Sequence, residues 1–364
     1  MKHSILSKCI KTAALALFLA SFSQCSSNRS LLTGIEPVEL EEEAETEAEP
    51  EIEIDELPPV IITSASTATL PVTTFNEIWA YVVAGSEAAL RRGLPLTDIV
   101  YFGAEIDAYG KLADVPRRQN LSFSGRVHLV VGSSGRALTH FALMPGSSER
   151  RTLIADLLAA ARNYDGLQID FENVPARDGE VFLSFLRELR AGLGDKMFTI
   201  ALPARTRKIA DDVYDYDKIK PIVDRIFVMA YDEHWSGSSP GSVASLQWCR
   251  NVANYSLSAI GRDKLVMGLP FYGRAWGDYS PSRALIYNTI AGIIRDENVR
   301  EIRYENGIPF FNYNKNVSIK VYFEDEKSLS ARMEMYKSLN VRAIGFWRLG
   351  QETQEVWKIL QLAP

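Results

Sequence analysis

Residues 164–175 read "YDGLQIDFENVP", and the middle of this stretch alternates strictly between apolar and polar side chains. One parity holds Leu167, Ile169 and Phe171, and the other holds Gln168, Asp170 and Glu172. A period of two predicts a β-strand with one apolar and one polar face. At a rise of about 3.3 Å per residue, Asp170 and Glu172 are about 7 Å apart on that polar face. Two carboxylates and a carboxamide in line are unusual for a merely solvated face, which indicates a site.

The rest of the chain alternates between strand-like and helix-like segments, the pattern of a parallel α/β sheet. Eight strands are predicted, at residues 77–83, 98–106, 126–132, 165–172, 197–203, 225–232, 264–273 and 343–350. Helix-like segments such as 148–163 and 179–194 fill most of the gaps, whereas residues 278–318 are β-like and irregular. The predicted fold class is therefore α/β, a (β/α)8 TIM barrel with a small insert between strands seven and eight.

The barrel explains the polar parity of the fourth strand. In a closed barrel, one parity of each strand contacts the helices and the other faces the interior. Gln168, Asp170 and Glu172 are then expected to point inward, with Glu172 at the C-terminal end of the strand. Enzymes of this architecture keep their active sites at that end.

The first 25 residues have the pattern of a bacterial export signal, with a basic start and an apolar run over residues 13–22 that is too short for a mature membrane span. Cys25 follows small residues, so we expect it to carry the lipid of a bacterial lipoprotein, although Gln24 is unusual before such a cysteine. An ordinary cleaved signal peptide is the alternative. The expected location is the cell envelope, with membrane contact through the lipid anchor only.

Residues 26–74 are predicted to be an acidic tether, because residues 36–56 hold 12 acidic side chains and no basic one. The catalytic body is expected at residues 75–364. From residue 60 onward the chain has 36 Lys and Arg against 34 Asp and Glu, so nothing favours nucleic-acid binding. We expect a monomer.

Cysteine and histidine positions predict neither a disulfide nor a metal site. Cys9 and Cys25 fall in the export segment, which leaves Cys249 as an expected buried helix residue. His234 in "YDEHW" has no neighbours at ligand spacing. No cofactor is expected either.

Four segments at predicted strand ends carry a resemblance to a known family. They are "DGLQIDFE" at strand four, "MAYDEHW" at strand six, "GLPFYGRAW" at strand seven and "GFWRLGQE" at strand eight. The first is similar to the D-G-x-x-x-D-x-E signature of glycoside hydrolase family 18. The combination resembles the bacterial branch that includes cell-wall and spore-cortex N-acetylglucosaminidases, over residues 75–362.

The resemblance implies cleavage of β-1,4 linkages at N-acetylglucosamine, in peptidoglycan or chitin-like glycans, by attack of the substrate's own acetamide oxygen. It implies that Glu172 is the general acid, that Asp170 orients the acetamide N–H, and that Tyr231 donates to the acetamide oxygen. Asp232 is implied to contact the sugar, and Trp347 to form an aromatic floor beneath it.

Three further residues follow from the resemblance with less support. Tyr272 and Arg274, at the end of strand seven, are expected to contact substrate. Gln168 stands where the family often has a third aspartate, and its carboxamide is expected to hydrogen-bond Asp170 without taking up a proton. We therefore expect a variant active site.

Other readings stay open at this point. The inward Asp170 and Glu172 are also compatible with an interior ion-pair network, and Tyr231, Trp347 and Trp235 with ordinary core aromatics. A catalytically weak or silent lectin on the same fold is the alternative function, and a structural envelope lipoprotein is a third. Glu172 distinguishes the first two, because silent relatives typically lose the general acid.

Overall fold

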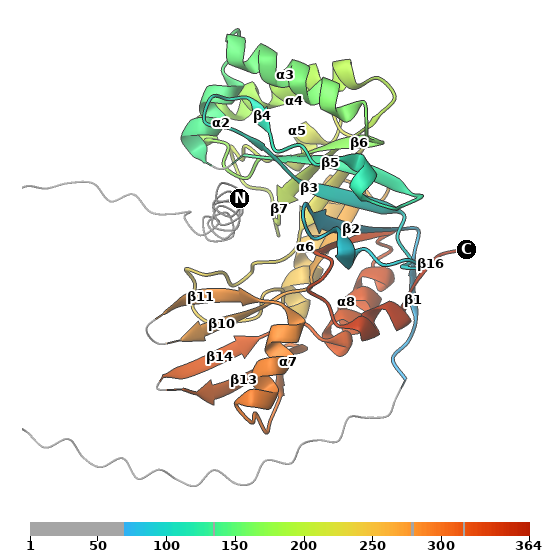
Figure 1. Ribbon diagram of the computed structural model, residues 1–364, viewed down its shortest axis with the longest axis vertical. Coiled ribbons are helices and arrows are strands. Elements are labelled where there is room, and N and C mark those ends of the chain that lie inside the picture. The colour runs from blue at the N-terminus through green and yellow to red at the C-terminus, as the bar shows by residue number, and fades with distance from the viewer. Residues whose placement is uncertain (1–68, 134, 278–279, 316) are drawn as a thin grey trace, which may run out of the picture.

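The computed structural model describes residues 69–133, 135–277, 280–315 and 317–364 (Figure 1). The predicted export segment, Cys25 and most of the acidic tether lie outside the described residues. Within the described part, no helix is both long and apolar enough to cross a membrane.

The predicted barrel is confirmed. Its eight parallel strands are β2 (Glu77–Val83), β3 (Asp98–Ile106), β5 (Arg126–Gly132), β6 (Gly166–Asp170), β7 (Met197–Pro203), β8 (Arg225–Met229), β9 (Leu265–Pro270) and β15 (Ala343–Trp347). Each strand pairs with the next, and β15 pairs back to β2, which closes the ring. A short strand, β4 (Leu112–Ala113), folds back antiparallel on β3 at its C-terminal end.

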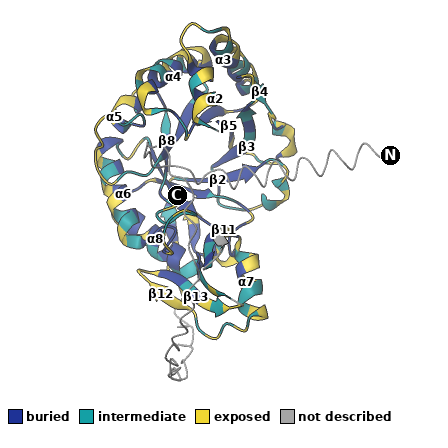
Figure 2. Cartoon of the chain, turned by 90° about the vertical axis from the view of Figure 1, so that its left-hand side faces the viewer, coloured by how far each residue is buried: buried dark blue, intermediate teal, exposed yellow. Residues whose placement is uncertain are grey.

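Helices surround the strands, which lie at the buried centre (Figure 2). They are α2 (Arg136–Leu143), α3 (Ser148–Ala161), α4 (Gly179–Leu193), α5 (Tyr216–Ile219), α6 (Leu246–Ala259) and α8 (Glu326–Ser338). The chain ends are held together by β1 (Thr73–Phe75), which pairs in parallel with β16 (Leu360–Leu362). Side chains of Ser147, Ser245 and Asp325 accept backbone N–H groups at the starts of α3, α6 and α8.

Helix α4 shows how the sequence produces this layer. Its apolar side chains recur every three or four residues, so that Phe182, Phe185 and Leu189 are buried against the sheet. The ring of Phe185 stacks on Phe171 at 5.8 Å. The helix ends at Gly194, whose φ of 59° suits a residue without a Cβ.

The insert forms a separate antiparallel sheet beside the barrel (Figure 1). It consists of β10 (Gly273–Gly277), β11 (Ser280–Leu285), α7 (Tyr287–Asp296), β12 (Arg303–Glu305), β13 (Ile308–Asn314) and β14 (Ser318–Tyr322). The element therefore extends beyond both expected bounds, 278 and 318. Ile290 of α7 packs on Phe311 and Val321 of the sheet, which gives the insert a small core of its own.

Candidate active site

The chain leaves the barrel at the end of β6, and here the structure corrects the sequence prediction. The strand was expected to run to Glu172, but it ends at Asp170. The Tyr214 hydroxyl donates to the carbonyl of Phe171 at 2.8 Å and accepts the N–H of Val174 at 3.0 Å. These two bonds hold the backbone in a turn, so Glu172 lies in that turn rather than on the strand.

Asp170 points into the barrel mouth, and only 8% of it is exposed. Its Oδ1 atom is buried and accepts no hydrogen bond within the described part of the chain. Desolvation raises the pKa of this carboxyl to about 7. Asp170 therefore changes protonation state near neutral pH, and one of its oxygen atoms is free to bind a donor.

Glu172 stands beside Asp170 with an exposed side chain. Desolvation by the protein around the mouth raises its pKa, and the negative charges of Asp170 and Asp232 raise it further. Two neighbouring carboxyls of this kind share protons, so a proton is retained on the pair near neutral pH.

Gln168 lies one layer below Asp170 and is fully buried. Its Oε1 accepts the hydroxyl of Tyr81 on β2, and its Nε2 donates to Oγ1 of Thr199 on β7 at 3.1 Å. The expected hydrogen bond to Asp170 is absent, and the amide instead links the neighbouring strands β2 and β7. Gln168 therefore supports the floor of the mouth from below. Because it has no exposed surface, it cannot make the expected contact with the sugar.

Tyr231 follows β8 and is half-buried at the mouth. Its ring meets that of Tyr272 edge to face, with centroids 6.3 Å apart. Desolvation raises its pKa, and the charges of Tyr81, Tyr272, Asp170 and Glu172 add to the rise. The phenol is therefore a neutral hydrogen-bond donor at physiological pH.

Asp232, Tyr272 and Arg274 form one cluster where the insert leaves the barrel. Oδ1 of Asp232 accepts the Tyr272 hydroxyl at 2.6 Å and Nη2 of Arg274 at 2.9 Å. Tyr272 is buried, whereas Asp232 is exposed and has a φ of 58°. The sequence pointed to these residues individually, and the structure joins them into a link between barrel and insert.

Trp347, the last residue of β15, lies over the aromatic interior of the barrel. The centroid of its ring lies 5.1 Å from that of Tyr81 and 5.3 Å from that of Phe102, both edge to face. The residue remains partly exposed. A partly exposed indole with a rigid aromatic base is the arrangement that sugar C–H groups stack on.

Sequence reasoning missed Tyr81, Thr199 and Tyr214, although they support the site. Tyr81 and Thr199 sit at inward positions of strands that were predicted correctly, so parity was the available signal. Tyr214 is in a loop after β7, and its bonds to the turn after β6 bridge 40 to 43 positions of sequence. No local pattern carries that information.

The opposite end of the barrel holds a cavity of about 530 Å³, lined by Asn76, Glu77, Thr97, Ser124, Gly125, Arg126 and Asp165. Its charged side chains all have partners in the protein: Asp165 accepts the backbone N–H of Val127 at 2.8 Å, and Glu77 and Arg126 form ion pairs. Glu77 accepts Arg225 at 2.6 Å and Asp98 accepts Arg126 at 2.7 Å. We therefore place the candidate site at the mouth. Across the described residues, no group of three or more His, Cys, Asp and Glu is arranged to hold a metal ion.

Comparison with known proteins finds similar sequences among enzymes of Bacillus. The cortical fragment-lytic enzyme of Bacillus subtilis is 31% identical over 235 residues, which cover 60% of this chain and 54% of that protein. The corresponding enzyme of Bacillus anthracis is 26% identical over 291 residues, covering 73% of this chain and 67% of that one. This chain spans 48–62% of the length of the first three curated relatives it matches.

Solved structures show the same fold. The spore cortex-lytic enzyme SleL of Bacillus cereus superposes with a TM-score of 0.70 at 23% identity, over 80% of this chain and 76% of that one. The family model described as glycosyl hydrolases family 18 matches residues 73–352 and thus includes every candidate residue of the mouth. The chain belongs to glycosyl hydrolase family 18.

Proposed function

We propose that the chain hydrolyses β-1,4 linkages at N-acetylglucosamine by a retaining, substrate-assisted mechanism. The observation that carries this proposal is the carboxyl pair of Asp170 and Glu172 in the barrel mouth. Among the described residues the pair has no basic partner, and the pKa of both members is raised. Family membership supports the same reaction.

In the first step, Glu172 gives its proton to the oxygen of the leaving sugar as the bond from that oxygen to the anomeric carbon breaks. The substrate's acetamide oxygen forms the new bond to that carbon, which produces a cyclic oxazolinium. The unpartnered Oδ1 of Asp170 accepts the acetamide N–H, and its negative charge stabilises the cation.

In the second step, a water molecule adds to the anomeric carbon and opens the oxazolinium ring. The Glu172 carboxylate takes the proton of that water, which restores the starting state. Tyr231 donates to the acetamide oxygen and holds it for attack, and the partly exposed Trp347 supports the sugar ring.

For the substrate, we propose glycan strands of the bacterial envelope, with chitin-type oligomers as the second class. The curated relatives from Bacillus are named for lysis of cortical fragments, which favours the first class. The test is to incubate the protein with purified peptidoglycan and with N-acetylglucosamine oligomers, and to identify new reducing ends by mass spectrometry. Binding of both without cleavage of either would instead support a silent lectin.

We further propose that Cys25 carries a lipid that holds the enzyme at the envelope through the acidic tether. The support is the apolar run that ends in "SFSQC" and the 12 acidic residues that follow. Cys25→Ala should move the protein from the detergent phase to the aqueous phase on partitioning. Unchanged partitioning would favour an ordinary signal peptide.

A further inference from the structure

Glu105 is a carboxylate of the mouth that the proposed mechanism does not use. It lies near the C-terminal end of β3, beyond an irregularity in the pairing with β5 between Phe102 and Ala104. Phe102 belongs to the interior cluster of the barrel, whereas Ala104 and Ile106 belong to the outer core. Because side chains alternate along a strand, Glu105 is on the interior side.

The register places Glu105 on the same row of the barrel as Asp170. Glu105 pairs with Gly132 of β5, and Gly132 pairs with Asp170 of β6. These three strands are neighbours in the sheet (Figure 1). Two strand spacings separate the backbones of the two residues by about 10 Å, and the glycine between them has no side chain to fill the gap.

Glu105 has no partner in the protein. It is partly buried, and it accepts no hydrogen bond and forms no ion pair within the described part of the chain. By comparison, Glu87, in the short 3-10 helix after β2, accepts the Gly85 N–H and the Tyr101 hydroxyl. Desolvation raises the pKa of Glu105, and the charge of Asp114 raises it further. A partly exposed carboxylate with no donor from the protein has both oxygen atoms available to a ligand.

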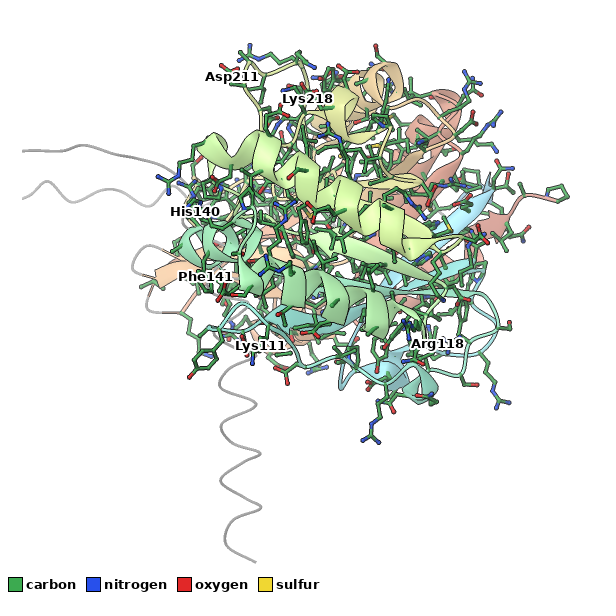
Figure 3. The ribbon with its side chains drawn as sticks, turned by 90° about the horizontal axis from the view of Figure 1, so that it is seen from above. Lys111, Arg118, His140, Phe141, Asp211 and Lys218 are labelled. Atoms are coloured by element: carbon green, nitrogen blue, oxygen red, sulfur yellow. The ribbon has the colours of Figure 1, made fainter. Side chains whose placement is uncertain are left out.

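The floor of the mouth reaches the same strand. The Trp347 ring contacts Phe102, which lies one interior row below Glu105 on β3. Glu105 therefore lies on the strand that the Trp347 floor contacts. Beyond β5 the chain enters α2, whose residues His140 and Phe141 lie close together in Figure 3, away from Arg118.

We propose that Glu105 is a specificity residue that accepts hydrogen bonds from hydroxyl groups of a second sugar, attached to the one whose acetamide meets Asp170 on the side away from the bond that is cleaved. This inference rests on the proposed function, because it assigns a further contact to the same glycan. It makes productive binding depend on the length of the glycan.

The test uses the full-length protein in detergent and N-acetylglucosamine oligomers from dimer to hexamer. Loss of one charge-assisted hydrogen bond weakens binding by about tenfold or more. Glu105→Ala should therefore raise KM for the hexamer about tenfold, leave its kcat unchanged, and leave the dimer unaffected. Glu105→Gln keeps the size of the side chain and one acceptor oxygen. Its KM for the hexamer should lie between those of wild type and Glu105→Ala, and it controls for a folding defect.

Asp114→Asn is the matched control. It removes the neighbouring charge at an exposed position whose φ of 52° an asparagine tolerates, and KM should not change. An equal change in KM for every oligomer length, or no change at all, would overturn the assignment of Glu105.

A binding measurement separates this inference from the proposed function. Calorimetry in a Glu172→Gln background should show weaker hexamer binding when Glu105→Ala is added. If wild type binds the oligomers but cleaves none, hydrolysis is disproved, while this comparison still decides the role of Glu105. Equal hexamer binding with and without Glu105→Ala would reject the subsite.

Discussion

The two ends of the barrel each bury an aspartate, and the two have opposite chemistry. Asp98, at the N-terminal end, is fully buried and accepts two bonds from Arg126, at 2.7 and 2.8 Å, and contacts Nε2 of His128 at 2.7 Å. Desolvation would raise its pKa, but the bonds from His128 and Arg126 outweigh it and lower the pKa. Asp170, at the C-terminal end, is opposed by no such partner, so its pKa rises.

Burial alone therefore does not make a carboxylate reactive. The two aspartates differ in the number of hydrogen-bond donors that surround them. The N-terminal end is a network in which Glu77 also pairs with Arg225, whereas the mouth leaves Asp170 and Glu172 beside each other without a cation. The first arrangement keeps charge in place, and the second keeps a proton available.

The most direct test of this comparison is a substitution at Glu172. Glu172→Gln keeps the shape of the side chain but removes the transferable proton. General acid catalysis contributes about 10²–10⁴-fold, so kcat on natural glycans should fall by that order while binding by calorimetry survives. Glu334→Gln, at an exposed position of α8, is the control and should leave kcat unchanged. Wild-type turnover in Glu172→Gln would show that the mouth pair does no acid chemistry.

At the other end, Asp98→Ala should affect stability and leave catalysis intact. Removing one partner of a buried charged network costs about 3 kcal/mol, because Arg126 and His128 lose their acceptor. The pKa of Asp98 is lowered, so its contribution is present above the unfolded pKa and lost as pH falls through the folded value. Urea unfolding at pH 7 should give the variant a lower free energy of unfolding than wild type. This difference should become smaller as the pH falls. A large loss of kcat at temperatures where the variant is folded would contradict this division of roles.

Asp170→Asn should change the free energy of unfolding in the opposite direction to Asp98→Ala. The folded carboxyl ionises near pH 7, whereas the unfolded one ionises near pH 4, so wild type loses stability as pH rises between these values. The variant should therefore be more stable than wild type above pH 7, by at most about 4 kcal/mol, with the difference vanishing below pH 4. Its kcat should also drop severely. An equally stable variant at pH 8 would mean that Asp170 carries no cost of burial.

Gln168 offers the smallest and sharpest test. Gln168→Glu keeps the length of the side chain and its acceptor for Tyr81, but places a titrating group below Asp170. The acidic limb of the pH–rate profile should move by about one unit, because a new carboxyl joins the coupled pair. Gln247→Glu, on the exposed face of α6, is the control. A profile identical to wild type would show that this buried layer does not influence the acid.

Much of the barrel followed from local pattern. The bounds of β2, β3, β5 and β7 agree with the prediction, because alternation and apolar runs are properties of consecutive residues. The inward parity of Gln168 and Asp170, and the clustering of candidate residues at one end, followed from the same pattern combined with barrel geometry.

The sequence by itself thus determined which side chains face inward and at which end of the barrel they meet. Only the tertiary structure decided what each one binds. Gln168 is 87 positions from Tyr81, Asp232 is 42 from Arg274, and the turn at Glu172 depends on the distant Tyr214. Hydrogen-bond partners depend on which strands adjoin and in what register, and these follow from closure of the whole ring, not from any short segment.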